Sequence, residues 1–363
     1  MQEKWRGKLI GNRVPYIDIA KGITIFLVIV GHAANNLDDP FYRLVLYYFH
    51  MPLFFMLAGM SIRPKTTYNA RVWKKMIRKN AVVLMVPYFL WGIMYATFSF
   101  FNIGRLAYGS WKALGKAETL TSLWYIPCLF LVRIEIHLLF QLFQKIKANI
   151  YVLSIVAAAV SFAIGFLLPY NEVRGYMWCA DISFVALGFV LIGFVTKGLF
   201  EKMCEWNMFL QAVGAVISAS GLFAGTWLQR GKAFTLVLMC DNVYGNLVLF
   251  FWNTVFGSLL VMFVSMMIAK YATRYRFAKA LIYIGQNTFA IYLLHKPILQ
   301  KLAMGFFGLF GFDAFDFWIV IVASVITLWV CIWAMRVIAI YLPQFLGKFP
   351  EPNVKVVQSA EEA

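Results

Sequence analysis

The side chains best suited to chemistry lie in an apolar stretch, YIDIAKGITIFLVIVGHAA, at residues 16–34. Its length and composition predict a membrane-spanning helix, yet it contains Asp18, Lys21 and His32. Lys21 and His32 are eleven residues apart, which on a helix is about 20° past three full turns and a rise of about 16 Å. Asp18 lies three positions before Lys21, close enough for an ion pair. The spacing predicts one polar stripe along this helix.

An imidazole can take a proton from a hydroxyl near neutral pH, so His32 is suited to acid/base catalysis. The alternative is that Asp18 and Lys21 lie among lipid headgroups while His32 caps the outer end. A charge at mid-membrane costs roughly 2.5 to 3.5 kcal/mol and usually faces a cavity or a partner. Further ionisable groups in the chain favour a functional interpretation.

The chain has four histidines. Counting depth along the predicted helices places His32, His50 and His295 in the outer half of the membrane and His137 toward the cytoplasm. Three outer imidazoles suit work on a substrate that arrives from outside, although a structural hydrogen bond between helices could explain each one singly.

Arg133 and His137 are four residues apart on one face of a predicted helix, whereas Glu135 points to nearly the opposite side. Arg133 therefore needs an acid from another helix, such as Asp181 or Asp18, or an anionic ligand. We expect the ion pair between helices. Asp181 begins its own predicted span near the outer surface, where it could equally be a solvated end residue.

The segment RPKTTYNARVWKKMIRK, residues 63–79, carries seven cationic side chains and is expected to be a cytoplasmic loop. Such loops set orientation and touch anionic lipid. A phosphate-rich ligand would also find its strongest attraction there, so Lys74, Lys75 and Arg78 are candidate contacts.

Hydrophobic residues make up 62% of the 363 residues and charged residues only 13%, which predicts an all-α, multi-pass membrane protein rather than a soluble domain. The net charge of +17 is spread between apolar segments, so it indicates topology and not nucleic-acid binding. The five cysteines form no CxxC or Cys/His cluster, so we expect no metal site.

Ten apolar runs are long enough to span a bilayer, and the short apolar centre of 229–244 could form an eleventh, re-entrant segment. Alternating loops place most Lys and Arg on one side, so both termini are expected in the cytoplasm. We expect one membrane domain over 1–349 and a short disordered tail over 350–363. The predicted spans are 17–36, 43–62, 80–101, 120–142, 150–168, 177–196, 207–228, 245–269, 279–300 and 317–341.

Four stretches together resemble the acyltransferase-3 family of integral membrane acyltransferases, most closely its fucose 4-O-acetylase-like branch. DIAKGITIFLVIVGH is similar to the family's basic-x10-His signature, with Lys21 where Arg is more frequent. YFHMPLFFMLAGM is similar to its FFxLSG stretch, with Ala58 in place of a frequent Ser. SLWYIPCLFLV and YIGQNTFAIYLLHKPIL, which contains His295, complete the resemblance over nearly the whole chain.

The resemblance implies transfer of an acyl group, usually acetyl from cytoplasmic acetyl-CoA, to a hydroxyl of a surface or exported glycan or a lipid-linked sugar. It places His32 at the family's essential histidine and the protein in a bacterial cytoplasmic membrane. The basic segment would then hold the phosphates of CoA, the donor substrate, and no permanently bound cofactor is expected. Acceptor specificity would reside in outer loops such as 102–119 and 229–244; the acceptor, the acyl length and the oligomeric state stay open.

We expect His32 to act either as a general base on the acceptor hydroxyl or as a nucleophile that forms acetyl-histidine. Asp18 and Lys21 would organise the inner part of the path, and His50 and His295 would position or polarise the acceptor. The rival interpretation is a secondary transporter or flippase that uses the same residues to relay protons or bind substrate. A scaffold subunit is disfavoured by the number of ionisable groups inside the spans.

Overall fold

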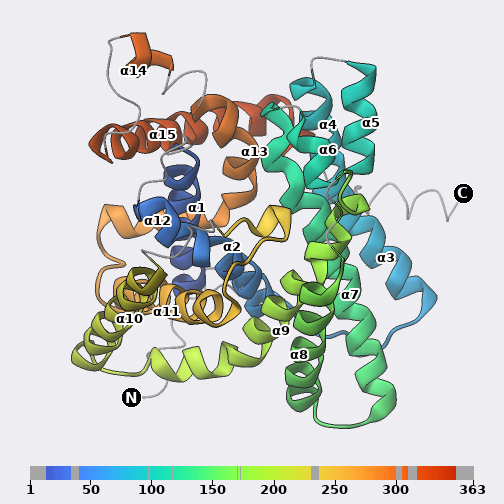
Figure 1. Cartoon of the computed structure of the whole chain (residues 1–363). Helices are drawn as coiled ribbons and strands as arrows, with labels where there is room; N and C mark the ends of the chain where they lie inside the picture. The colour runs from blue at the N-terminus through green and yellow to red at the C-terminus, as the bar shows by residue number, and fades with distance from the viewer. Residues whose placement is uncertain are drawn as a thin grey trace, which may run out of the picture.

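A computed structural model describes residues 14–33, 41–96, 99–116, 118–169, 171, 173–229, 237–299, 305–309 and 317–348. Within these ranges the chain is helical, and the one β-type pairing is an isolated antiparallel bridge between Leu238 and Val243 (Figure 1). The α-helices are α1 (Pro15–Ala33), α2 (Phe41–Ser61), α3 (Ala70–Asn80), α4 (Val86–Tyr95), α5 (Phe100–Tyr108), α6 (Trp111–Gly115), α7 (Tyr125–Ile146), α8 (Ile150–Leu167), α9 (Ala180–Met203), α10 (Met208–Gln229), α11 (Leu247–Tyr271), α12 (Arg276–Gln286), α13 (Thr288–Ile298), α14 (Gly305–Leu309) and α15 (Phe317–Tyr341). The short elements are the π-helix η1 (Ala81–Met85) and the 3₁₀ helices η2 (Glu118–Trp124), η3 (Met177–Cys179), η4 (Met239–Asp241) and η6 (Pro343–Leu346).

Eight helical stretches in the described part of the chain are long and apolar enough to cross a membrane. They fall on eight of the ten segments predicted from the sequence and confirm a multi-pass, all-helical membrane protein. The number of crossings and the side of the termini stay predictions. The eight stretches are α1, most of α2, η2 with α7, α8, η3 with α9, α10, α11 and α15.

The other two predicted spans, 80–101 and 279–300, are each divided. A π-helical turn, η1, precedes Pro87 at the start of α4, because proline has no N–H to donate and its ring clashes with the carbonyl one turn back. The second segment breaks at Asn287, whose backbone leaves the helical region between α12 and α13.

The basic segment expected to be a loop over 63–79 is partly helical. Asn69 caps the start of α3, because its side chain accepts a hydrogen bond from the Val72 backbone N–H at 2.9 Å. Only 62–69 is therefore extended. The predicted outer loop 102–119 likewise contains most of α5 and all of α6.

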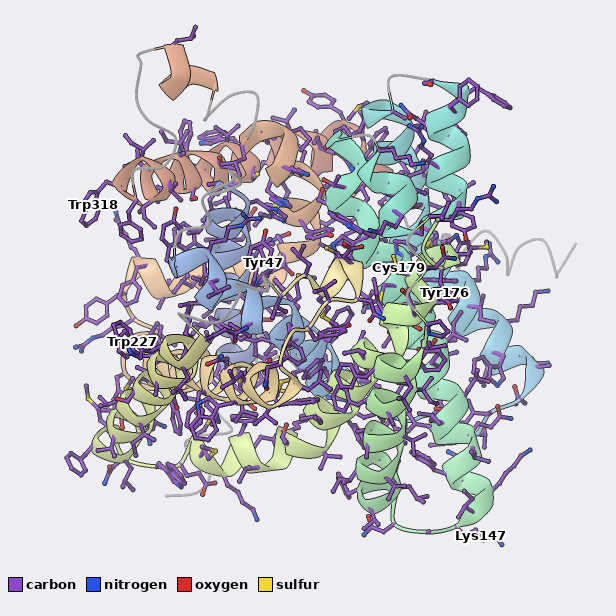
Figure 2. All side chains as sticks on the ribbon, viewed as in Figure 1. Tyr47, Lys147, Tyr176, Cys179, Trp227 and Trp318 are labelled. Atoms are coloured by element: carbon purple, nitrogen blue, oxygen red, sulfur yellow. The ribbon has the colours of Figure 1, made fainter. Side chains whose placement is uncertain are left out.

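α1 lies near the centre of the molecule, where it packs against α2, α11, α12, α13 and α15 (Figure 1). Its apolar window is 72% buried, against 28% for α8 and α15 and 22% for α10. The sparsely buried helices turn aromatic side chains outward, as Trp227 on α10 and Trp318 on α15 show (Figure 2). Their outer faces suit contact with lipid, whereas the side chains of α1 face the interior.

α2 and α9 cross in close contact through two glycines. A Cβ atom at Gly193 on α9 would overlap the backbone carbonyl oxygen of Met56, and one at Gly59 on α2 would overlap that of Val190. Small residues at such crossings let two backbones approach, which is the usual means of packing helices in a membrane. This contact fixes the position of α2, which carries part of the candidate site.

Two predicted segments lie outside the described residues. The tail 350–363 is not described, so its disorder and the domain boundary at 349 stay predictions. Residues 230–236 of the possible re-entrant segment are also not described; the following residues, 237–246, form η4 and the bridge.

Candidate active site

A cavity of about 840 Å³ lies among α1, α2, α3, α7 and α13. Each helix contributes residues at helical spacing, so each turns one stripe of side chains toward the space. The main lining positions are Lys21 and Ile25 on α1; Met51, Phe54, Ala58 and Ser61 on α2; Lys75 and Lys79 on α3; Tyr125, Leu129, Arg133 and His137 on α7; and Thr288, Phe289 and Tyr292 on α13.

The lining of this cavity is strongly cationic. Its described lining residues include six Lys or Arg side chains and no Asp or Glu. The cavity therefore attracts anions, and its low-dielectric walls strengthen that attraction. The six are Lys21, Arg63, Lys65, Lys75, Lys79 and Arg133.

Arg133 lies deep in the cavity and donates from Nη1 to the Asn80 Oδ1 at 3.1 Å. The expected ion pair with Asp181 or Asp18 is not formed, because neither carboxylate lies within ion-pair distance of the guanidinium. Glu135 faces away, as expected, and accepts from the Ser183 hydroxyl at 2.7 Å. Arg133 is therefore held by a neutral amide, and the alternative of an anionic ligand stays a prediction.

The side chains of Lys21 and Asp18 contact different neighbouring helices. Lys21 Nζ donates to the Ser61 hydroxyl at 3.3 Å and lines the cavity. Asp18 is buried against α12, where its Oδ2 accepts from Gln286 Nε2 at 3.1 Å. The ion pair expected between Asp18 and Lys21 is absent, because the two side chains turn to different neighbouring helices.

Tyr68 joins the basic segment to α7. Its hydroxyl lies 2.8 Å from His137 Nδ1 and accepts from the Lys65 backbone N–H at 3.3 Å. Burial raises the pKa of Tyr68, so the phenol stays protonated and can donate to His137. Trp73 adds a second link, since its Nε1 donates to Gln141 at 3.0 Å. These bonds hold the cations of 63–79 at the mouth of the cavity.

His32 and His295 form a pair of imidazoles beyond the other end of the cavity. Their ring centroids are 5.2 Å apart. His295 Nδ1 lies 2.7 Å from the Tyr292 carbonyl oxygen, which can only accept, so Nδ1 carries the proton. The neutral His295 ring then presents a lone pair on Nε2, which is buried and has no hydrogen-bond partner among the described residues. The pair thus offers an unused proton acceptor.

His50 belongs to the same cluster. Its Nδ1 lies 2.6 Å from the Leu46 carbonyl oxygen, and its ring packs against Tyr47 at 5.0 Å. His50 and two cations, Arg43 and Lys296, lie close enough for their charges to act on His32. His32 therefore lies within a cluster of polar side chains.

The histidine pair continues the stripes that line the cavity. His32 lies seven residues beyond Ile25 on α1, about 10 Å along the helix axis, and His295 one turn beyond Tyr292 on α13. Tyr292 belongs to both regions, because it lines the cavity and its ring lies 5.6 Å from that of His295. His32 itself is not a lining residue of the cavity.

The structure thus places a cationic cavity and a neighbouring imidazole pair inside one bundle of apolar helices. Residues 14–336 match the acyltransferase domain of the acyltransferase-3 family. The chain belongs to this family. It is also 27% identical over 322 residues to the nodulation protein NolL of Mesorhizobium japonicum, a match that covers 82% of this chain and 79% of NolL. The protein is accordingly a multi-pass membrane acyltransferase, and its membership of the fucose 4-O-acetylase-like branch stays a prediction.

Three residues predicted for this acyltransferase site lie elsewhere. Lys74 and Arg78 are exposed and absent from the cavity lining, because they lie on a different face of α3 from Lys75 and Lys79. Asp181 is buried at the start of α9, in a small hollow beside Asp241. Lys75, Arg133 and Lys21 line the cavity, and their functional roles stay predictions.

Sequence reasoning missed several residues of the acyltransferase site. A helical pattern beginning at Ala70 would have shown that Val72, Lys75 and Lys79 share one face of α3. Lys296 follows His295 directly, and its Nζ donates to the Thr121 hydroxyl. No sequence signal places Arg43 beside His32, since that contact depends on how α2 packs on α1.

Proposed function

We propose that this membrane acyltransferase moves an acetyl group from cytoplasmic acetyl-CoA to a hydroxyl of a surface or exported glycan, including a lipid-linked sugar, in a bacterial cytoplasmic membrane. One observation carries the proposal: five helices line a cationic cavity, and two of them, α1 and α13, continue from it to the imidazole pair. A donor bound by its phosphates at one end can thus direct its reactive end toward His32.

The cations at the mouth of the cavity suit the phosphates of CoA. Arg63, Lys65, Lys75 and Lys79 come from the basic segment and α3, and they are exposed enough to receive a ligand from water. Charge-assisted hydrogen bonds to phosphate are stronger than neutral ones. The apolar part of the lining, which includes Phe54, Leu129 and Phe289, then suits the pantetheine arm.

His32 would act as the general base. It takes the proton of the acceptor hydroxyl while the oxygen attacks the thioester carbonyl carbon, and the tetrahedral intermediate expels the CoA thiolate. The imidazolium returns the proton to that thiolate, so the step leaves an ester and free CoA thiol. General-base catalysis of this kind is typically worth about 10²- to 10⁴-fold.

His295 would assist from the other side of the pair. Its Nε2 lone pair can accept a hydrogen bond from His32 or from the acceptor hydroxyl, which orients that group for reaction. His50 completes the polar surroundings of the acceptor. A covalent acetyl-histidine on His32 is the alternative mechanism, and it would give ping-pong kinetics.

The direct test uses the purified full-length chain in liposomes with acetyl-CoA labelled in the acetyl group and an extract of the producing cell's glycans. Label in the carbohydrate fraction supports the proposal, and mass spectrometry of the product identifies the modified sugar. Failure of any label to leave CoA in the presence of the extract would contradict it.

In the same assay, the Arg133→Met substitution is expected to raise the KM for acetyl-CoA, because the cavity loses a cation on α7.

A further inference from the structure

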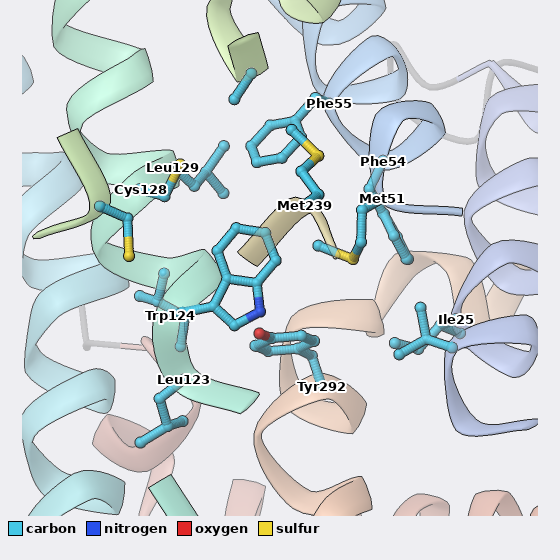
Figure 3. Packing of buried hydrophobic residues seen from close by; sticks show 14 of the residues in the cluster. Ile25, Met51, Phe54, Phe55, Leu123, Trp124, Cys128, Leu129, Met239 and Tyr292 are labelled. Atoms are coloured by element: carbon cyan, nitrogen blue, oxygen red, sulfur yellow. The ribbon is translucent and has the colours of Figure 1, made fainter. Parts of the chain in front are cut away.

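Four side chains line the end of the cavity from which α1, α2 and α13 lead on to the histidines. They are Ile25 on α1, Met51 on α2, Tyr125 on α7 and Tyr292 on α13, and all four line the cavity. We call them the closing ring. Figure 3 shows Met51 and Tyr292 converging on one space, with Ile25 on one side and Trp124 on the other.

Three members of the closing ring are held in place. The Tyr292 hydroxyl donates to the backbone carbonyl of Ser122. Tyr125 packs between rings, 5.3 Å from Tyr292 and 5.0 Å from Phe55. Ile25 is fully buried and β-branched, so its χ1 angle is restricted.

Met51 is the adjustable member. It is 8% exposed and unbranched, with three rotatable bonds and a soft thioether that adapts to irregular spaces. Because its neighbours are anchored, the room at this point depends mainly on the length and conformation of the side chain at position 51.

The geometry of the thioester places the acyl chain against this ring. The carbonyl carbon is trigonal: its sulfur leads back to the cavity and one face must meet the attacking oxygen beside His32. The alkyl group is therefore directed sideways. The Tyr292 ring lies 5.6 Å from that of His295, so the closing ring borders the imidazoles. An acyl chain directed sideways at this point extends toward the closing ring, whose adjustable member is Met51.

We infer that Met51 sets the length of the acyl group that this enzyme transfers, with the closing ring admitting acetyl and excluding longer chains. The inference rests on the proposed use of an acyl-CoA donor. It concerns the inner end of the cavity alone and is independent of which sugar accepts the group.

The test uses inverted membrane vesicles from cells that produce the full-length chain, supplied with acetyl-, propionyl- or butyryl-CoA labelled in the acyl group. Label recovered in carbohydrate is measured for the unaltered chain, Met51→Ala, Met51→Phe and Met56→Ala. Met56 is a matched control, because it lies on α2 with the same 8% exposure and does not line the cavity.

Met51→Ala is expected to raise the butyryl-to-acetyl ratio about ten-fold or more, since one methylene in a hydrophobic pocket typically changes selectivity by 10- to 200-fold. Met51→Phe is expected to lower the propionyl-to-acetyl ratio, and Met56→Ala to leave both ratios unchanged. If Met51→Ala does not fold, Met51→Phe decides alone.

Unchanged ratios in an active Met51→Phe enzyme and in any folded Met51→Ala enzyme would overturn the inference and leave the proposed function standing. Absence of transfer from every acyl-CoA by the unaltered chain would instead remove the proposed function, and the inference with it.

Discussion

His295 shows how a backbone contact can prepare a side chain for chemistry. The Tyr292 carbonyl oxygen fixes the proton on Nδ1. The buried Nε2 is therefore an acceptor, and it has no hydrogen-bond donor among the described residues. An unsatisfied polar atom in a buried site normally costs about 1 to 3 kcal/mol. A substrate that supplies the missing donor would recover that cost on binding.

Replacing His32 by Ala is expected to lower the rate of acyl transfer about 10²- to 10⁴-fold, because the acceptor hydroxyl loses its base. The rate is measured with labelled acetyl-CoA, and the amount of protein in the membrane fraction serves as the control. His137→Ala tests specificity, since His137 lines the donor end and not the imidazole pair. A His32→Ala enzyme with full activity would show that another group takes the proton.

The sequence predicted individual site residues where the helix pattern alone determined their position. Lys21 and His32 do lie at the two ends of one face of α1, next to the cavity and in the histidine cluster respectively. The sequence could not predict hydrogen-bond partners. Asp18 accepts from Gln286 and Arg133 donates to Asn80, and both contacts depend on the packing of α12 and α3.

At the scale of elements, the two broken helices matter most. The break at Asn287 separates α12, which packs on α1, from α13, which carries Tyr292 and His295 into the site. The π turn before Pro87 interrupts the helix that begins with the basic residues of α3. Both were predicted as uninterrupted spans, because apolar length reports burial in a membrane and not the continuity of the backbone hydrogen bonds.

Two adjacent cations on α3 allow a contact in the cavity to be distinguished from a charge on the surface. Lys79 lines the cavity and Arg78 does not, although both are exposed. Lys79→Met is expected to raise the KM for acetyl-CoA about two- to five-fold, because exposed charge contacts are weak. The increase should be smaller at high salt than at low salt, because salt screens the charge. Arg78→Met should leave the KM unchanged. Equal effects of the two substitutions would indicate a general surface field and not a contact in the cavity.

The crossing of α2 and α9 can be tested with two glycines on one helix. Gly193→Ala places a methyl group against the Met56 carbonyl and is expected to destabilise the protein by about 1 to 3 kcal/mol, whereas a Cβ at Gly198 meets nothing within 4 Å. Thermal unfolding in detergent measures both. A Gly193→Ala protein as stable as Gly198→Ala would mean that the two helices are not in close contact.

At the scale of the whole molecule, the cavity and the imidazole pair lie at successive levels of one helix bundle. The cations gather at one end of the cavity and the histidines lie beyond the other, with the closing ring between them. Under the proposed function, a donor and an acceptor held in different compartments would meet inside the protein. The hydrophobic composition predicted the membrane setting; only the packing of α1, α2, α7 and α13 shows that one cavity and one imidazole pair are aligned.

This alignment predicts sidedness. CoA esters do not cross lipid, so acetyl-CoA should support transfer when it is added to the face that carries residues 63–79 and not when it is added to the other face. Inverted and right-side-out vesicles containing the chain, each given labelled acetyl-CoA outside, provide the comparison, and detergent permeabilisation should restore activity to the inactive set. We expect at least a ten-fold difference between the sealed preparations, limited by the fraction of misoriented vesicles. A cavity that is closed toward one compartment cannot accept a charged donor from that compartment. Equal rates in the two preparations would therefore show that the donor reaches the histidines from either side.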